Sequence, residues 1–265
     1  WKSLESFKKD NKMNILKKII AEKEVEIKKL NYSGFDQAIF NPKDFMKSLL
    51  SNGISIIAEI KFKSPSMGQL LDPKDVVKIA KNYESAGASA ISILTDKKFF
   101  DGDINFLKQV ASEVSIPVLR KDFILSKAQI IESGIYSADS LLLISEILES
   151  SQLNYLYNFA RKLNLIPLVE LHSRESLAKV FDLNPKIVGV NCRNLETMET
   201  NLKHFEELIT ELPKNSIKVA ESGISSSEDI KYINNLGYDA VLVGTSLMRN
   251  NNPGKALEEL IGGVL

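Results

Sequence analysis

From residue 55 onward the sequence alternates between short apolar runs and amphipathic segments, and this repeat restricts the possible folds more than any other feature. The runs are continuously apolar rather than alternating with polar residues, as parallel strands covered by helices require. Successive runs begin roughly 20 to 35 residues apart, which is the length of a strand–helix unit. The predicted strands are Ser55–Ile60, Ala88–Leu94, Ile116–Leu119, Ser140–Ile144, Ile166–Glu170, Ile187–Asn191, Ile217–Glu221 and Ala240–Gly244.

The segments between these runs show helical periodicity. Gly87 and Gly237 stand directly after two of them, where helices commonly end in a residue with left-handed backbone. Eight strand–helix units predict an α/β protein of the (β/α)8 TIM barrel class, with a doubly wound open sheet as the alternative. The clearest helical segments are Pro73–Ala86, Leu153–Leu163, Ser173–Phe181 and Ser226–Leu236.

Two extra helices are predicted before the first strand. Asn14–Leu30 has the period of an amphipathic helix, with apolar residues near one face. Asn41 followed by Pro42 predicts the start of the second helix, because proline suits the first helical position after a capping residue. We expect both helices to cover one end of the barrel. Their apolar positions are Leu16, Ile20, Ile27, Leu30, Phe45 and Leu49.

The composition excludes several classes of protein. Equal numbers of basic and acidic side chains, 34 of each, give no electrostatic basis for binding nucleic acid or an anionic membrane. The single cysteine, Cys192, excludes an intramolecular disulfide, and with only two histidines no metal site is expected. No apolar run approaches the ~20 residues of a membrane helix, and the N-terminus lacks the apolar core of a secretory signal.

No linker divides the chain. We therefore expect one domain over residues 1–265, in which residues 1–50 hold the N-terminal extension and helices and residues 51–265 form the barrel. Without targeting signals, the expected location is the cytoplasm.

Polar residues follow most of the predicted strands, at the end of the barrel where active sites lie. The sharpest transition is Pro117–Phe123, where a buried run passes abruptly into Arg120, Lys121 and Asp122. Any one such residue is most simply a solvated loop charge. Six charged residues on one rim favour a functional site, in which neighbouring charges and burial set the pKa values of the side chains. The six charged residues are Glu59, Lys61, Lys121, Glu170, Arg193 and Glu221, and Asn191 joins them.

The last two strands are followed by glycine and hydroxyl residues, in Ser222-Gly223-Ile224 and Gly244-Thr245-Ser246. Glycine lets backbone amides approach an anion, and a phosphate site after these two strands is common in barrels. The simpler interpretation is a pair of tight turns. Because two such turns lie on adjacent strands, we predict a phosphate site; no P-loop or dinucleotide fingerprint is present.

Seven motifs in order resemble the indole-3-glycerol phosphate synthase family, from about residue 13 to the C-terminus. They are AEIKFKSPS (58–66), ISILTDKKFFDGD (91–103), PVLRKDFI (117–124), LVELH (168–172), VGVNCRNL (188–195), VAESGI (219–224) and LVGTSLM (242–248). The resemblance implies a (β/α)8 barrel with extra N-terminal helices. It also implies conversion of 1-(2-carboxyphenylamino)-1-deoxyribulose 5-phosphate to indole-3-glycerol phosphate, with loss of carbon dioxide and water. This step of tryptophan biosynthesis needs no cofactor.

The resemblance assigns the acid–base roles by motif. Lys121 resembles the general acid that assists ring closure at the substrate carbonyl, and Glu170 the acid–base group of the later dehydration. Glu59 would orient or deprotonate, and Lys61 would hold the anthranilate carboxylate. The chemistry independently requires acids and bases near one ketone, together with cations for two anionic ends.

The remaining roles implied by the resemblance concern binding. Asn191 and Glu221 would contact sugar hydroxyls or position the lysines, and Arg193 would lie near the carboxylate. Phe99 and Phe123 would flank the aromatic ring. The residues implied around the phosphate are Ser64, Ser222, Gly223, Gly244 and Thr245.

Two positions depart from the family pattern. Cys192 replaces a frequent asparagine, and Asp103 replaces a frequent serine. Neither belongs to the acid–base set, and no neighbour supplies a base that would make Cys192 a nucleophile. His172 either orients Glu170 or is a loop histidine.

The expected partner is a small phosphorylated substrate, bound by a monomer. Two alternatives stay open. A related barrel, phosphoribosylanthranilate isomerase, would need a strand-end cysteine and aspartate, where the first strand here ends in Glu59 and Lys61. A non-catalytic barrel would have no reason to keep the acid–base set.

Overall fold

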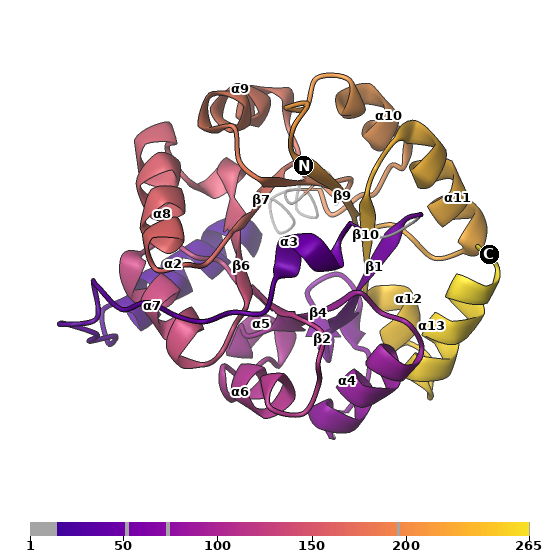
Figure 1. Ribbon diagram of the computed structural model, residues 1–265, viewed down its shortest axis with the longest axis horizontal. Helices are drawn as coiled ribbons and strands as arrows, with labels where there is room; N and C mark the ends of the chain where they lie inside the picture. The colour runs from indigo at the N-terminus through magenta and orange to yellow at the C-terminus, as the bar shows by residue number, and fades with distance from the viewer. Residues whose placement is uncertain (1–14, 51–52, 73–74, 195–196, 265) are drawn as a thin grey trace, which may run out of the picture.

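The strands of the protein close into an eight-membered barrel with helices around it (Figure 1). The structure is a computed structural model that describes residues 15–50, 53–72, 75–194 and 197–264. Around the barrel the strand order is β1-β10-β9-β8-β7-β6-β5-β4, and the paired neighbours run parallel. The strands are β1 (Ser55–Ile60), β4 (Ala90–Leu94), β5 (Val118–Lys121), β6 (Ser140–Ile144), β7 (Leu168–Leu171), β8 (Ile187–Asn191), β9 (Ile217–Glu221) and β10 (Ala240–Val243). The predicted TIM barrel is therefore confirmed.

The outer helices bury the outward-facing side chains of the strands. They are α4 (Val76–Ser85), α6 (Asn105–Ala111), α7 (Lys127–Ile135), α8 (Ser150–Lys162), α9 (Arg174–Leu183), α10 (Lys203–Ile209), α11 (Ser227–Leu236) and α13 (Pro253–Gly262). Gly87 and Gly237 both have positive φ, 97° and 95°, at the ends of α4 and α11, as predicted. The predicted helix start at Pro73 lies outside the described residues, and α4 is capped by Asp75.

Short elements follow several strands at the carboxyl end of the barrel. A two-stranded antiparallel hairpin, β2 (Lys63–Ser64) and β3 (Gly68–Gln69), follows β1. The helices α5 (Lys97–Phe100), η1 (Ser145–Ile147) and α12 (Thr245–Met248) follow β4, β6 and β10. These segments position the site described below.

The two N-terminal helices lie at opposite ends of the barrel, which corrects the expectation that both cover one end. α3 (Phe45–Ser48) belongs to the amino end: Lys43, just before it, donates from Nζ to the carbonyl of Val114 at 2.7 Å, shortly before β5 begins. α2 (Ile15–Ile27) reaches the carboxyl end, where Lys23 pairs with Asp122 directly after β5. α3 lies in front of the strands in Figure 1.

Both helices also differ from their sequence predictions. Asn14 lies outside the described residues, and the most buried face of α2 carries Ile19 and Lys23, whereas the four apolar residues predicted to define that face are only half-buried. The predicted start at Asn41-Pro42 is wrong: α3 begins at Phe45, and Asp44 caps it by accepting from the Lys47 amide. The preceding segment stays extended because its backbone is held by other parts of the chain, as where the Lys43 amide donates to Asp139.

Strand β5 also extends beyond its predicted end. The sequence prediction stopped at Leu119 because three charged residues follow, yet Arg120 and Lys121 belong to the strand. Their charges are paired by distant side chains, so tertiary contacts outweigh the cost of charged residues in a buried strand. In the part of the chain that the structure describes, no helix is long and apolar enough to cross a membrane.

Candidate active site

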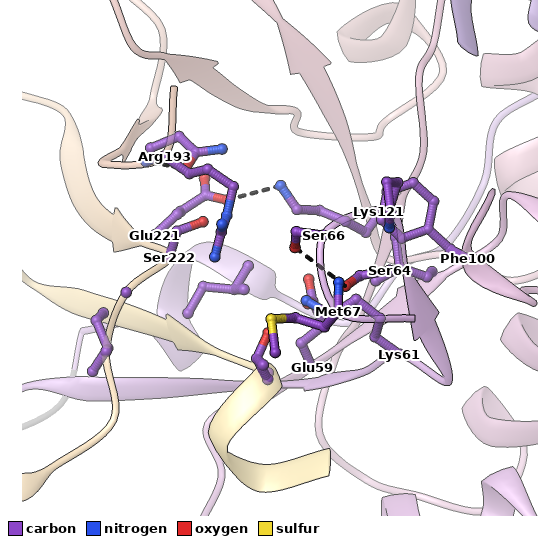
Figure 2. A pocket seen from close by; sticks show the side chains of 18 of the residues that line it. Glu59, Lys61, Ser64, Ser66, Met67, Phe100, Lys121, Arg193, Glu221 and Ser222 are labelled. Carbon is purple, nitrogen blue, oxygen red and sulfur yellow. Dashed lines mark hydrogen bonds and ion pairs between the residues drawn. The ribbon is translucent and has the colours of Figure 1, made fainter. Parts of the chain in front are cut away.

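A pocket of about 330 Å³ opens at the carboxyl ends of the strands (Figure 2). Of the residues predicted for the site, Phe99 alone does not line it. Those that do are Glu59, Lys61, Ser64, Lys121, Phe123, Glu170, Asn191, Arg193, Glu221, Ser222, Gly223, Gly244 and Thr245. The hairpin β2–β3 adds Ser66 and Met67 at its edge. The parallel barrel therefore brings together residues that are far apart in the sequence.

An ion cluster centred on Lys121 lies in the pocket. Nζ of Lys121 is 2.5 Å from Oε2 of Glu170 and 2.8 Å from Oε2 of Glu221, so one ammonium bridges β5, β7 and β9. The two carboxyl groups are almost fully buried, with side chains 2% and 1% exposed. Figure 2 shows Lys121 pointing toward Glu221. Because little water reaches these groups, their charges are set by one another.

The pKa values of the cluster separate its members. Burial lowers the pKa of Lys121, but the carboxylates of Glu170, Glu221 and Glu59 outweigh it and raise that pKa above its usual range. Burial raises the pKa of Glu170, but Lys121 outweighs it and lowers that pKa. Burial and the charge of Glu170 raise the pKa of Glu221 to about 8, against the pull of Lys121. Near neutral pH the cluster therefore holds an ammonium, an ionised Glu170 and a protonated Glu221.

A second ion pair lies at the end of β1. Lys61 donates to Oε1 of Glu59 at 2.7 Å, and Glu59 is buried while the lysine is partly accessible from the pocket. The carboxyl groups of Glu59 and Glu221 each lie against a glycine that leaves room for them. A Cβ on Gly244 would overlap the Glu59 carboxylate, and a Cβ on Gly189 would overlap that of Glu221. Sequence reasoning missed Gly189, which gives no local turn signal because it lies inside β8.

Asn191 orients Glu170. Its Nδ2 donates to Oε1 of Glu170 at 3.1 Å, and its Oδ1 accepts from the backbone amide of Arg193 at 3.0 Å. The guanidinium of Arg193 donates to the Met198 carbonyl at 2.7 Å, which holds it at the pocket wall. His172 is a loop histidine, because its Nδ1 lies 2.7 Å from the backbone carbonyl of Asn191 and no contact joins it to Glu170 within the described residues.

The two glycine-hydroxyl turns both reach the pocket. Ser222 and Gly223 have consecutive left-handed backbone, each with φ of 72°, which turns the chain sharply after β9. Space beside Gly223 is small, since a Cβ there would lie 3.0 Å from Sγ of Cys192. Burial raises the pKa of that thiol to about 11, and Sγ lies 3.2 Å from the carbonyl of Ser222. Cys192 therefore packs the turn as a neutral thiol.

A cation that the sequence reasoning missed lies near the same turns. Arg249, which ends α12, lines the pocket and lies against the sulfur of Met67 at 3.4 Å. It follows Thr245 by one helical turn, a spacing that could have revealed it. Asp103 lies outside the pocket, where it accepts from the Asn105 amide at 2.8 Å before α6.

One wall of the pocket is apolar. Phe100 and Phe123 have ring centroids 6.1 Å apart at 34°, and both line the pocket. Phe99, one residue earlier, does not line the pocket, although Phe99 and Phe100 both pack against the buried cluster that contains Ile19 and Phe123. Of the two adjacent phenylalanines, Phe100 is therefore the one that lies beside Phe123 at the pocket wall.

No group of three or more histidine, cysteine, aspartate or glutamate side chains suited to a metal ion occurs among the residues that the structure describes.

Comparisons with known proteins identify relatives over nearly the whole chain. Residues 8–260 match the family described as indole-3-glycerol phosphate synthase. The indole-3-glycerol phosphate synthase of Priestia megaterium is 42% identical over 251 residues, which cover 94% of this chain and 98% of that protein. The protein of the same name from Campylobacter jejuni subsp. doylei is 40% identical over 257 residues, covering 93% of this chain and 100% of that protein.

Solved structures at low identity show the fold alone. The crystal structure of 3-hexulose-6-phosphate synthase from Salmonella typhimurium has a TM-score of 0.65 at 11% identity, and covers 80% of this chain and 98% of that chain. Thiamine phosphate pyrophosphorylase from Pyrococcus furiosus has a TM-score of 0.60 at 17% identity, and covers 83% of this chain and 97% of that chain.

Proposed function

The chain belongs to the indole-3-glycerol phosphate synthase family, and on that premise we propose how the side chains in its pocket divide the work of the reaction. The enzyme is a carboxy-lyase of tryptophan biosynthesis. It closes the ring of 1-(2-carboxyphenylamino)-1-deoxyribulose 5-phosphate and releases carbon dioxide and water.

Lys121 is the general acid of ring closure. When the aromatic carbon attacks the substrate ketone, the carbonyl oxygen gains negative charge and needs a proton. The ammonium of Lys121 is the central cation of the pocket cluster and stays protonated because three carboxyl groups raise its pKa. The observation that carries this role is the position of Nζ of Lys121, which contacts the carboxyl groups of both Glu170 and Glu221.

Glu170 and Glu221 serve the steps that follow. After carbon dioxide leaves, the new hydroxyl must depart as water and a proton must leave the ring. An ionised Glu170, oriented by Asn191, is suited to take that proton and to pass it to the departing hydroxyl, which then leaves as water. Glu221 holds Lys121 in place and keeps the cluster from carrying two negative charges against one ammonium.

The two ends of the substrate need separate cations. Lys61, paired with Glu59, lies on the rim with part of its side chain accessible, and it would hold the carboxylate before decarboxylation together with Arg193. The phosphate would lie against the turns after β9 and β10, near Gly223 and Gly244. Phe100 and Phe123 would flank the aromatic ring. Ser64, Ser222 and Thr245 complete the proposed phosphate site.

The alternatives lack such support. An isomerase mechanism with a cysteine acid–base group does not suit Cys192, whose thiol is buried and has a raised pKa. Convergence of the acid–base set on one pocket argues against a non-catalytic barrel. We propose that the protein acts as a monomer. We also propose a cytoplasmic location, which the biosynthetic reaction favours.

A first-turnover experiment on Glu170→Gln tests the division of roles. The glutamine keeps the shape and the contact with Asn191 but cannot take a proton. Mixed with excess enzyme, the substrate should release carbon dioxide while the rise in indole fluorescence is delayed at least 100-fold. Lys121→Met is the control, in which both signals should be lost together. Equal loss of both signals in Glu170→Gln would place Glu170 before decarboxylation.

A further inference from the structure

The N-terminal helix α2 sends a buried lysine into the carboxyl end of the barrel. Lys23 is only 2% exposed, although it belongs to a helix on the outside of the barrel. Its Nζ lies 2.9 Å from Oδ2 of Asp96 and 3.0 Å from Oδ1 of Asp122, and it also pairs with Glu26 on its own helix at 2.8 Å. One ammonium therefore joins α2 to the segments that follow β4 and β5.

Asp96 organises the segment after β4. Its Oδ1 accepts from the backbone amide of Phe99 at 2.7 Å and so caps α5, the short helix that ends in Phe100. The Asp96 carbonyl accepts from the Gly102 amide at 2.8 Å and closes the turn beyond that helix. The position of the Phe100 ring therefore depends on Asp96.

Asp122 organises the segment after β5, directly after Lys121. Its Oδ1 accepts from the Phe123 amide at 2.8 Å, and its Oδ2 accepts from Oγ1 of Thr95 at 2.6 Å. Burial raises the pKa of Asp122, but Arg120 and Lys23 outweigh it and lower that pKa to about 2. Asp122 is therefore a permanent anion between the general acid and an aromatic wall of the pocket.

Stability alone is a weak reason for this arrangement, because buried ion pairs are often no more stabilising than apolar residues of similar volume. The ion pairs of Lys23 do, however, fix the distance and orientation of the segments after β4 and β5 relative to each other. They join the two segments that carry Phe100 and Phe123, whose rings form the slot, and the second segment starts next to Lys121.

We propose that Lys23 is a positioning residue of the reaction, which holds the segments after β4 and β5 so that the aromatic slot and Lys121 keep their productive geometry. The proposal rests on the role of Lys121 in ring closure. A displacement of about 1 Å at a reacting group can cost ~100-fold in rate. Loss of Lys23 should therefore lower turnover more than it weakens substrate binding.

The test compares Lys23→Met with Ile19→Ala, a variant of the buried apolar residue one turn earlier on α2. Both should lower the melting temperature. At a temperature where both are folded, Lys23→Met should lose ~10- to 100-fold in kcat with KM changed less than threefold. Ile19→Ala should keep kcat within about twofold, and Lys23→Arg, which keeps the charge, should recover part of the lost turnover.

A second variant covers the case in which Lys23→Met does not fold. Lys23→Met/Asp96→Asn keeps the net charge of the cluster, and asparagine can still cap α5. The same loss of kcat is expected. If either folded Lys23 variant retains turnover while Lys121→Met is inactive, the positioning role of Lys23 is overturned and the role of Lys121 stands. Turnover retained in Lys121→Met overturns the role of Lys121 itself.

Discussion

Replacing Lys121 by methionine removes the charge on which the pocket is centred while keeping the approximate length of the side chain. The substitution should lower both turnover and folding stability, for two different physical reasons. Turnover should fall ~10²- to 10⁴-fold, because a positioned proton donor acts on the transition state. Folding stability should also fall, because the variant leaves two buried carboxyl groups without their cation.

The size of the stability loss follows from the protonation of the cluster. Glu221 already carries a proton below its pKa of about 8, so at neutral pH the substitution strands one charge, that of Glu170. Breaking a buried ion pair by removing one partner costs about 3–5 kcal/mol. That loss should depend on pH, since protonating Glu170 relieves it.

In the unchanged protein the lowered pKa of Glu170 contributes stability above its ordinary value of 4.5. Without Lys121, burial outweighs the hydrogen bond from Asn191 and raises that pKa, so the folded variant holds a proton that the unfolded chain releases. The difference in unfolding free energy between the two proteins should therefore grow from pH 5 to pH 8.

Denaturant unfolding at pH 5 and pH 8 measures the stability change, and indole fluorescence with direct substrate titration separates kcat from binding. The double variant Lys121→Met/Glu170→Gln is the matched control, because it removes one charge of each sign. It should regain stability at pH 8 without regaining turnover. The reasoning fails if Lys121→Met keeps turnover within tenfold of the unchanged enzyme, or if its stability loss is equal at both pH values.

Three further predictions follow from the same pocket. Lys61→Met should raise KM at least tenfold in steady-state kinetics, because the substrate carboxylate loses its cation. Lys63 lies outside the pocket, so Lys63→Met should change KM little. Equal effects of the two substitutions would remove Lys61 from the carboxylate site. Gly223→Asp should raise KM far more than Gly223→Ala. The alanine variant is the control, because it also strains the left-handed backbone but adds no charge. Equal KM values in the two folded variants would place the phosphate elsewhere. Glu221→Gln should flatten the fall in melting temperature between pH 4.5 and 8, because the folded enzyme holds the Glu221 proton that the unfolded chain loses; an unchanged slope would contradict the raised pKa.

The sequence predicts the barrel well because its strongest signal is local. β1, β6, β8 and β9 have the boundaries that their apolar runs predict. Continuous burial of a parallel strand leaves a run that needs no knowledge of distant residues. The carboxyl-end rule then places the polar strand ends on one rim, so most of the site follows from the same local pattern.

What sequence reasoning missed depends on contacts between distant segments. Gly189 is required by the Glu221 carboxylate on the neighbouring strand, and a lone glycine in an apolar run does not reveal that neighbour. Phe99 and Phe100 are adjacent, and the capping of α5 by Asp96 decides which of them reaches the pocket. Lys23 has the sequence context of a surface lysine, yet it is buried by two aspartates more than 70 residues away.

The triplet Arg120-Lys121-Asp122 shows where the limit of sequence reasoning lies. Alternation along a strand requires Arg120 and Lys121 to point to opposite sides of the barrel wall. That rule sends Lys121 inward to Glu170 and Glu221, and Arg120 outward, where it donates to Glu132 on α7 at 2.8 Å. The direction of each charge was therefore available from the sequence. The charged partners that let β5 continue through both charges were not, because they belong to three other elements of the fold, α7, β7 and β9.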